Sequence, residues 1–344
     1  MKDPTQLLYF RALKNAFLQL LPIYTRRKKR MAKVAAIGEV MVELAPYPVK
    51  DPDSREVLAL SFAGDTFNTA VYMARLGVNT TYITNLGDDP YSAQILQRMS
   101  DENIDTQLIN TLTGRSPGLY LIRNTSDGER QFFYWRKEAP ARELFSDPTA
   151  AHHLTQQLKK FDCVYLSGIT LAIITEQARE TLLQSLQELR ATGVTIAFDS
   201  NYRPRLWPDK ITAQQTIMAV LQHTDIALLT LDDEQLLWGE DSIQSCVNRY
   251  QNTSITELVI KRGASDTIVI TDGQELHVPV PPVDNIVDTT GAGDTFNAGY
   301  LVARLNKKSV IEAAQQGTRC AGIIIRYRGG VIDKTAFMRE LTRI

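Results

Sequence analysis

Residues 288–306 read DTTGAGDTFNAGYLVARLN, a short turn with two glycines that leads into a stretch with the apolar spacing of a helix. Glycine lets the backbone approach a ligand closely, and the dipole of the following helix adds partial positive charge at its first turn. Such a turn suits an anion such as a phosphate. Asp294 lies where the turn meets the helix, so it is either a simple N-cap or a functional carboxylate.

The same pattern occurs a second time, near the beginning of the chain. Residues 63–77 read AGDTFNTAVYMARLG, and residues 292–306 read AGDTFNAGYLVARLN. The remainder of the two halves shows no matching order, so a shared physical role explains the repetition better than gene duplication does. We expect two glycine turns at helix starts, with Asp and Thr at capping positions, and therefore two polar ligands.

Short apolar runs alternate with helical patterns, of which Gln177–Arg190 and Thr212–Leu221 are two examples. Seven runs are predicted to be strands buried on both faces: Lys33–Ile37, Thr80–Ile83, Val164–Leu166, Thr195–Phe198, Ala227–Leu229, Leu258–Ile260 and Ile268–Ile270. Strands that alternate with helices predict an α/β domain with a central, mostly parallel sheet and helices on both faces.

Residues 118–136, GLYLIRNTSDGERQFFYWR, depart from that alternation. They are predicted to form a hairpin around the turn residues Asn124–Gly128, with no helix between its strands. With residues 40–62, this hairpin would form a small separate sheet, a lid over a crevice. Neighbouring side chains on a strand point to opposite faces, which places Phe132, Tyr134 and Arg136 on one face and Phe133 and Trp135 on the other. Exposed aromatic residues on the lid suggest a homo-oligomer that buries them.

Composition excludes several function classes. Three widely spaced cysteines without C-x-x-C spacing argue against a disulfide framework and a zinc site, and they favour a reducing, cytoplasmic location. None of the four histidines shows H-E-x-x-H spacing, which argues against a zinc hydrolase. The net charge is −1, but residues 1–30 carry +7 and the remainder −8, so nucleic acid is a poor partner for the body of the protein.

Residues 1–30 are a basic leader in which the cluster Arg26–Arg30 follows an apolar run, whereas a secretory signal has its charge first. Arg11 and Lys14, just before that run, make the stretch too polar to span a membrane. A strand pattern opens directly after Met31, so we interpret the leader as upstream sequence outside the native fold and residues 31–344 as one domain. The alternative is a basic amphipathic helix that touches an anionic surface.

Two common phosphate-binding motifs are absent from the sequence. A Walker A loop requires Gly-Lys followed by Ser or Thr, and no Gly-Lys pair occurs in the chain. The dinucleotide fingerprint G-x-G-x-x-G fails at Gly291 and Gly293 because Phe296 occupies the third glycine position.

Several segments together resemble the ribokinase-like carbohydrate kinases: DTTGAGDTF, Ala63-Gly64-Asp65 with Asn68, the strand and loop at Leu228–Glu234, and Lys261-Arg262-Gly263. The segments GLYLIR, FFYWRKEA, YLSGI, NYRPRLW and LLTLDDE resemble the branch of that family that phosphorylates 2-keto-3-deoxygluconate. The resemblance extends from Met31 to about residue 335. It implies transfer of phosphate from ATP, with Mg²⁺, to the 6-hydroxyl of 2-dehydro-3-deoxy-D-gluconate.

The resemblance also implies roles for individual residues. Asp294 would be the general base, and the backbone N–H groups of Gly291, Ala292, Gly293 and Asp294 would form the anion hole for the transferred phosphoryl group. The residues implied to bind the sugar are Gly64, Asp65, Asn68, Tyr120, Tyr134, Arg136 and Arg203. The residues implied to contact the nucleotide are Asn201, Thr230, Asp232, Glu234, Lys261, Arg262 and Gly263, together with Gly291 and Gly293. Leu231 stands where the family usually has Asn, so no Mg²⁺ ligand is assigned.

The arginines favour an acid sugar over a neutral one. Arg203 follows the predicted strand Thr195–Phe198, and ligands of open α/β sheets bind just beyond such strand ends. Arginine presents a planar fork that matches a carboxylate. The alternatives are a structural ion pair for Arg203, a solvated lid position for Arg136, and a fructokinase or other neutral-sugar kinase for the whole protein. A catalytically inert sugar-binding regulator would lack the base or the glycines of the turn, which are present.

Overall fold

The computed structural model describes residues 30–47, 49, 56–124, 130–239 and 242–343. Ala32–Ile344 forms one compact unit. The predicted leader, residues 1–30, falls almost entirely outside the described residues.

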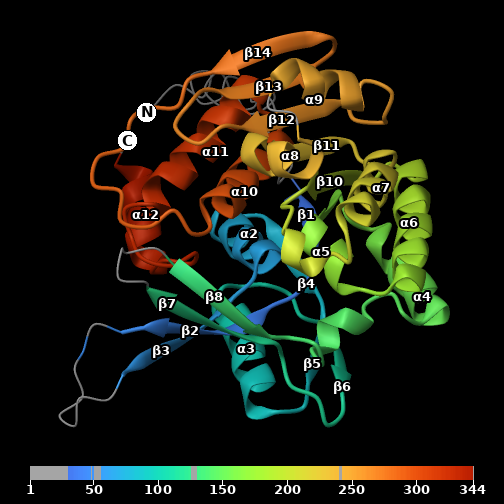
Figure 1. Cartoon of the computed structure of the whole chain (residues 1–344), viewed down its shortest axis with the longest axis vertical. Helices are drawn as coiled ribbons and strands as arrows, with labels where there is room; N and C mark the ends of the chain where they lie inside the picture. The colour runs from blue at the N-terminus through green and yellow to red at the C-terminus, as the bar shows by residue number, and fades with distance from the viewer. Residues whose placement is uncertain (1–29, 48, 50–55, 125–129, 240–241, 344) are drawn as a thin grey trace, which may run out of the picture. The chain divides into compact units, whose positions relative to one another are not determined.

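The central sheet has eight strands in the order β14-β13-β12-β11-β10-β9-β1-β4 (Figure 1). These strands are β1 (Lys33–Ile37), β4 (Asn79–Ile83), β9 (Cys163–Ser167), β10 (Thr195–Asp199), β11 (Ile226–Thr230), β12 (Glu257–Lys261), β13 (Thr267–Thr271) and β14 (Gln274–Val278). The six strands from β4 to β12 are parallel, and β13 and β14 add an antiparallel hairpin at one edge. The prediction of a mostly parallel α/β sheet is confirmed.

Alternate residues of the strands face two separate hydrophobic clusters. In β1, Val34 and Ala36 belong to one cluster, while Ala35 and Ile37 belong to the other. The first cluster packs against α2 (Asp65–Arg75), α3 (Pro90–Asp101), α10 (Ala292–Leu305), α11 (Val310–Ile324) and α12 (Lys334–Thr342). The second packs against α4 (Pro148–Leu158), α5 (Gly168–Ile173), α6 (Glu176–Ala191), α7 (Lys210–Leu221), α8 (Leu231–Trp238) and α9 (Ile243–Tyr250). Burial on both faces explains why the strands read as continuous apolar runs.

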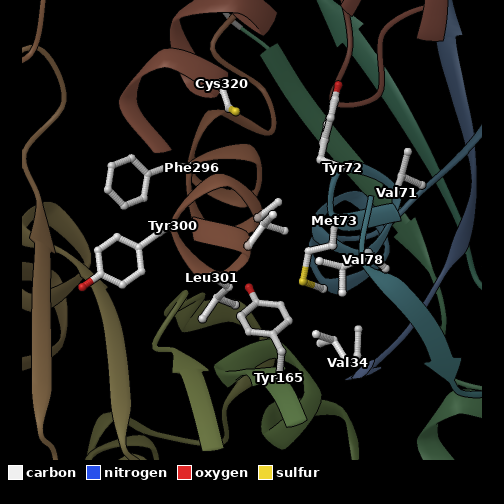
Figure 2. Packing of buried hydrophobic residues seen from close by; sticks show 14 of the residues in the cluster. Val34, Val71, Tyr72, Met73, Val78, Tyr165, Phe296, Tyr300, Leu301 and Cys320 are labelled. Atoms are coloured by element: carbon white, nitrogen blue, oxygen red, sulfur yellow. The ribbon is translucent and has the colours of Figure 1, made fainter. Parts of the chain in front are cut away.

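Figure 2 shows part of the first cluster, in which Tyr165 of β9 points toward the helices that carry Met73 and Leu301. The hydroxyl of Tyr165 accepts a hydrogen bond from Thr69 of α2 at 3.4 Å and from Asn297 of α10 at 3.2 Å. A fully buried tyrosine hydroxyl requires such partners. Tyr165 therefore ties the sheet to the first turns of both helices.

A second sheet has the order β3-β2-β7-β8, with β2 parallel to β7 and the outer pairs antiparallel. Its strands are β2 (Met41–Pro46), β3 (Leu58–Ala63), β7 (Leu119–Asn124) and β8 (Arg130–Trp135). The predicted lid is confirmed as a separate sheet, and the predicted turn after Asn124 lies outside the described residues. Phe132 and Tyr134 pack with Tyr120 on one face. Tyr134 is nevertheless about half exposed, and Phe133 and Trp135 on the other face are exposed as well.

The remaining elements are short: β5 (Asn85–Gly87) pairs with β6 (Asn110–Leu112), and two 3-10 helices cover Pro140–Glu143 and Pro204–Leu206. Within the described part of the chain, no helix combines the length and the apolar character that crossing a membrane requires.

The parallel register brings the carboxyl ends of several strands to one edge of the sheet. Asp199 at the end of β10 lies opposite Ser167, and Thr230 at the end of β11 lies opposite Lys261. Polar residues that are far apart in the sequence are therefore collected at the edge where open α/β sheets bind ligands.

Candidate active site

Two helices begin at this edge, and each begins after a glycine. Gly64 is the N-cap of α2 and Gly291 the N-cap of α10, and neither helix has a side-chain cap. A Cβ on Gly64 would lie 2.1 Å from the carbonyl oxygen of Glu39. Gly291 has a φ of 75°, and a Cβ there would lie 2.8 Å from Cα of Gly330. Only glycine fits either position.

The expected capping role of Asp and Thr in these turns is therefore wrong. Asp65 is the first residue of α2, and Asp294 is the third residue of α10, so neither stands at the N-cap. Because glycine takes the cap position, the two carboxylates are available for other partners. The interpretation of Asp294 as a simple N-cap is excluded.

Three carboxylates meet between these helices and the sheet, and each accepts a hydrogen bond from an asparagine amide. The pairs are Asp294 with Asn68 at 2.8 Å, Asp65 with Asn201 at 2.8 Å, and Asp199 with Asn297 at 2.6 Å. Asn68 and Asn297 occupy equivalent positions in the two AGDTFN segments. Of these two amides, that of Asn68 in α2 bonds to a carboxylate of α10, and that of Asn297 in α10 bonds to a carboxylate at the end of β10.

Lys261 contributes a positively charged ammonium group to this cluster. Its Nζ lies 3.3 Å from Oδ2 of Asp199 and 2.9 Å from Oδ1 of Asn297. The residue is buried at the end of β12. One cation among three carboxylates leaves the cluster with excess negative charge when all of them are ionised.

Burial and that excess charge together raise the pKa of Asp294. Exclusion of water by the surrounding protein is the main cause that raises the pKa of Asp294 to about 8, and Asp65 and Asp199 add to the rise. The amide of Asn68 and the ammonium of Lys261 oppose it. Burial also raises the pKa of Asp65. A carboxylate with a pKa near the working pH is suited to general-base catalysis.

Replacing Asp294 with Asn should stabilise the fold, increasingly so as pH rises. A carboxyl group has a pKa of about 3.9 in an unfolded chain, so raising it in the folded state makes its contribution to the free energy of unfolding decline from about pH 4 to about pH 8. The Asn side chain does not ionise. We expect the melting temperature of Asp294→Asn to exceed that of the wild type by roughly 2–5 °C at pH 8 and by little at pH 4.5.

The measurement is a pair of thermal melts at the two pH values. The exposed Asp284 provides the control, since Asp284→Asn should give the same difference from wild type at both. A difference for Asp294→Asn that did not change with pH would contradict the assigned protonation.

The glycine turn at Gly291 is fixed by a neighbouring loop. Oδ1 of Asp288 accepts the N–H of Thr290 at 3.0 Å, and its Oδ2 accepts the N–H of Gly329 at 2.6 Å. Asp288 therefore holds the turn in place. At the start of α10, the N–H of Ala292 donates to the carbonyl oxygen of Thr289 at 3.2 Å, while the first N–H groups of a helix have no partner within the helix itself. A helix start of this kind suits a phosphate, and it lies beside Asp294.

The sequence implied two arginines on the sugar side, and both are already paired with carboxylates. Arg136 forms an ion pair with Glu39, and both side chains are buried. Nη1 of Arg203 lies 3.1 Å from Oδ1 of Asp233, and its side chain is about half exposed, at 51%. Burial raises the pKa of the Tyr134 hydroxyl, whereas Arg136 and Arg203 lower it, so the lid and the sheet edge meet at this tyrosine.

The residues implied to contact the nucleotide divide into two groups. Asn201 and Lys261 belong to the carboxylate cluster. Arg262 instead pairs with Asp266. Glu234 is fully buried, accepts hydrogen bonds from Tyr250 at 2.5 Å and Arg249 at 3.2 Å, and has its pKa raised to about 7, chiefly by burial.

The remaining implied residues lie at turns or at the lid. Asp232 is exposed in the first turn of α8, and Thr230 is the N-cap of that helix. Gly263 follows β12 with a φ of 60°. In the lid, the hydroxyl of Tyr120 donates to the carboxylate of Glu43.

Sequence reasoning missed Glu39 and Asn297 as members of the site. Glu39 follows the end of β1, so the rule that polar residues beyond strand ends bind ligands could have identified it. Asn297 stands out in the sequence only as part of the repeated segment, because nothing local shows that its amide reaches Asp199, 98 residues away.

Comparison with known proteins gives a consistent result. The family model described as pfkB family carbohydrate kinase matches residues 31–336. The chain is 44% identical over 313 residues to the 2-dehydro-3-deoxygluconokinase of Escherichia coli (strain K12), covering 88% of this chain and 98% of that protein. It is 43% identical over 310 residues to the 2-dehydro-3-deoxygluconokinase of Dickeya dadantii (strain 3937), covering 88% of this chain and 97% of that protein.

A solved structure is similar in fold. The putative ribokinase II from E. coli in complex with ATP and Mg²⁺ has a TM-score of 0.77 at 22% identity, and the match covers 91% of this chain and 100% of that chain. At this identity, the similarity establishes the ribokinase-like fold of the chain.

Proposed function

Because this chain belongs to the pfkB family of carbohydrate kinases, we propose that it transfers the γ-phosphate of ATP to the 6-hydroxyl of 2-dehydro-3-deoxy-D-gluconate. The product is 2-dehydro-3-deoxy-6-phospho-D-gluconate. The observation that carries the proposal is the position of Asp294, whose carboxylate lies in the first turn of α10 and is oriented by Asn68 from the facing helix. Relatives with 38–44% identity carry the name of this activity.

The chemistry follows from that arrangement. Asp294 accepts the proton of the sugar hydroxyl as its oxygen attacks phosphorus, and the N–H groups from Gly291 to Asp294 stabilise the charge on the transferred phosphoryl group. Phosphoryl transfer depends mainly on positioning and charge stabilisation, so a rigid base and a fixed anion hole suffice. Thr230, Asp232 and Gly263 lie at strand ends along the same edge, where the nucleotide would bind.

Mg²⁺ neutralises phosphate charge when it is bound with the nucleotide. Among the described residues there is no group of three or more His, Cys, Asp or Glu side chains that could hold a metal ion. Mg²⁺ is usually bound through substrate phosphates and only one or two carboxylates.

The lid supports an acid sugar as the substrate. Nε of Arg136 is buried and has no hydrogen-bond partner among the described residues, although the side chain pairs with Glu39. A buried donor without a partner costs free energy, and a ligand that accepts from it recovers that cost. Together with the half-exposed Arg203, it offers donors for a carboxylate.

The partners and location follow from the same features. We expect ATP and a small acid sugar as ligands, with neither nucleic acid nor a membrane as partner. The exposed Phe133 and Trp135 favour a homo-oligomer formed through the lid. Three buried cysteines, all with free thiols, favour the cytoplasm.

A coupled kinase assay across acid and neutral sugars tests the function. We expect kcat/KM for 2-dehydro-3-deoxygluconate to exceed that for fructose and ribose by at least about 100-fold, because two charge-assisted contacts are lost with a neutral sugar. ATP consumption without sugar is the control. A preference for fructose would identify a neutral-sugar kinase, and sugar binding without turnover would identify an inert regulator.

A further inference from the structure

Lys261 lies directly beneath the glycine turn that begins α10. A Cβ built on Gly293 would lie 3.6 Å from Nζ of Lys261. Only 8% of the residue is exposed, so the ammonium is held inside the protein. Its neighbour in the sequence, Arg262, is turned to a different partner, Asp266. The position of Lys261 is thus set by the polar cluster and not by solvent.

The contacts of Lys261 link two elements of the site. The ammonium donates to Oδ1 of Asn297, and the amide of Asn297 donates to Oδ2 of Asp199, the same oxygen that lies near the ammonium. Asn297 is one turn after Asp294 on α10. A closed set of contacts therefore connects the ends of β10 and β12 to the helix turn that carries the base.

Burying an ammonium group costs free energy unless the group is paired. Here one ammonium lies among several acidic groups. The groups that face Asp294 are Asp65 and Tyr72 from α2, Asp199 from β10, Tyr165 from β9, Tyr120 from β7 and Lys261 from β12. Among these, Lys261 is the cation, while the other ionisable groups are acids. The charge of Lys261 therefore acts on the protonation of Asp294 with a sign opposite to that of the other ionisable groups named here.

We propose that Lys261 is a positioning residue for Asp294 and not a nucleotide contact: anchored by Asp199 and Asn297, its ammonium fixes the first turn of α10 and favours the ionised form of the base. The same charge lies beneath Gly293, where the phosphoryl group would bind, so it also stabilises negative charge on that group. The inference rests on the proposed kinase function, in which Asp294 must be ionised to accept a proton.

The test compares the pH dependence of kcat in two variants that change charge in opposite directions. Lys261→Met removes the cation, so the acid limb of the profile should move about one pH unit higher, and kcat at pH 7 should fall roughly 10- to 100-fold. Asp199→Asn removes a negative charge at nearly constant shape, so its acid limb should move lower. KM for ATP should change less than about threefold in both.

Lys261→Arg is the matched control, since it keeps the charge and should leave the acid limb near that of the wild type even if kcat falls. An unshifted limb in Lys261→Met with a large rise in KM for ATP would overturn the proposal and make Lys261 a nucleotide contact. Should Lys261→Met fail to fold, Lys261→Gln, which removes the charge but keeps a polar side chain, takes its place with the same two opposed outcomes. Assays use whichever sugar the wild type phosphorylates best, so failure of the acid-sugar assignment would not affect this test.

Discussion

Asp294→Asn is expected to lower kcat by roughly two to four orders of magnitude, the usual effect of losing a general base. The substitution preserves the shape of the side chain and its place in the first turn of α10, so KM should change little. The amide can still contact Asn68, but it cannot accept the proton of the sugar hydroxyl. Steady-state kinetics at pH 8 and a thermal melt on the same preparation measure the two effects.

Asp65→Asn is the matched comparison, because Asp65 and Asp294 occupy the same position in the two AGDTFN segments. Its carboxylate bonds to Asn201 and would contact the sugar, so we expect its main effect on KM. Near-normal kcat in Asp294→Asn, with an intact melting transition, would show that another group accepts the proton.

Loss of Arg203 should reduce selectivity for the acid sugar. Each charge-assisted contact with a carboxylate is worth about 1.5–3 kcal/mol, so Arg203→Ala should lower kcat/KM for 2-dehydro-3-deoxygluconate by on the order of 10- to 100-fold. Fructose has no carboxylate and should lose far less. The fold should tolerate the change, since the Arg203 side chain is 51% exposed and an exposed ion pair contributes at most about 1 kcal/mol.

Arg136 requires a more conservative variant. Alanine there would leave Glu39 buried without its partner, at a cost of about 3–5 kcal/mol in stability. Arg136→Lys keeps the charge that pairs with Glu39 but loses the planar fork of donors. It therefore tests binding of the substrate carboxylate without removing the buried ion pair. The nearby exposed Arg205 provides the control through Arg205→Ala. Equal losses on the acid and the neutral sugar would mean that these arginines serve the phosphates or the lid.

The sequence predicted the strands better than it predicted the site. Thr195–Phe198 became β10 (Thr195–Asp199) because burial on both faces makes the apolar run itself the signal. β14 was not predicted, since its residues are largely exposed and give no such run. The sequence predicted that most strands run parallel, but not their order in the sheet, because the pairing of particular strands depends on contacts across the whole domain.

The failures at the site have one physical origin. Aspartate was expected at both helix caps from local preference, but close backbone approach from Glu39 and Gly330 reserves those positions for glycine. The partner of Lys261 is 62 residues away and that of Asn68 is 226 residues away, so spacing along the chain gives no indication of either contact. Family resemblance supplied Asp294 and the arginines, while the ion pairs of Arg136 with Glu39 and of Arg203 with Asp233 emerged only from the fold.

The hydrogen bond between Asn68 and Asp294 has a consequence for how the protein is made. Synthesis proceeds from the N-terminus, so Asn68 leaves the ribosome long before Asp294 exists. Until residue 294 has been added, Asn68 lacks the carboxylate that it contacts in the folded protein, and every N-terminal fragment that ends before that residue lacks the proposed base. Kinase activity during translation should therefore appear late and abruptly, as a property of the finished chain.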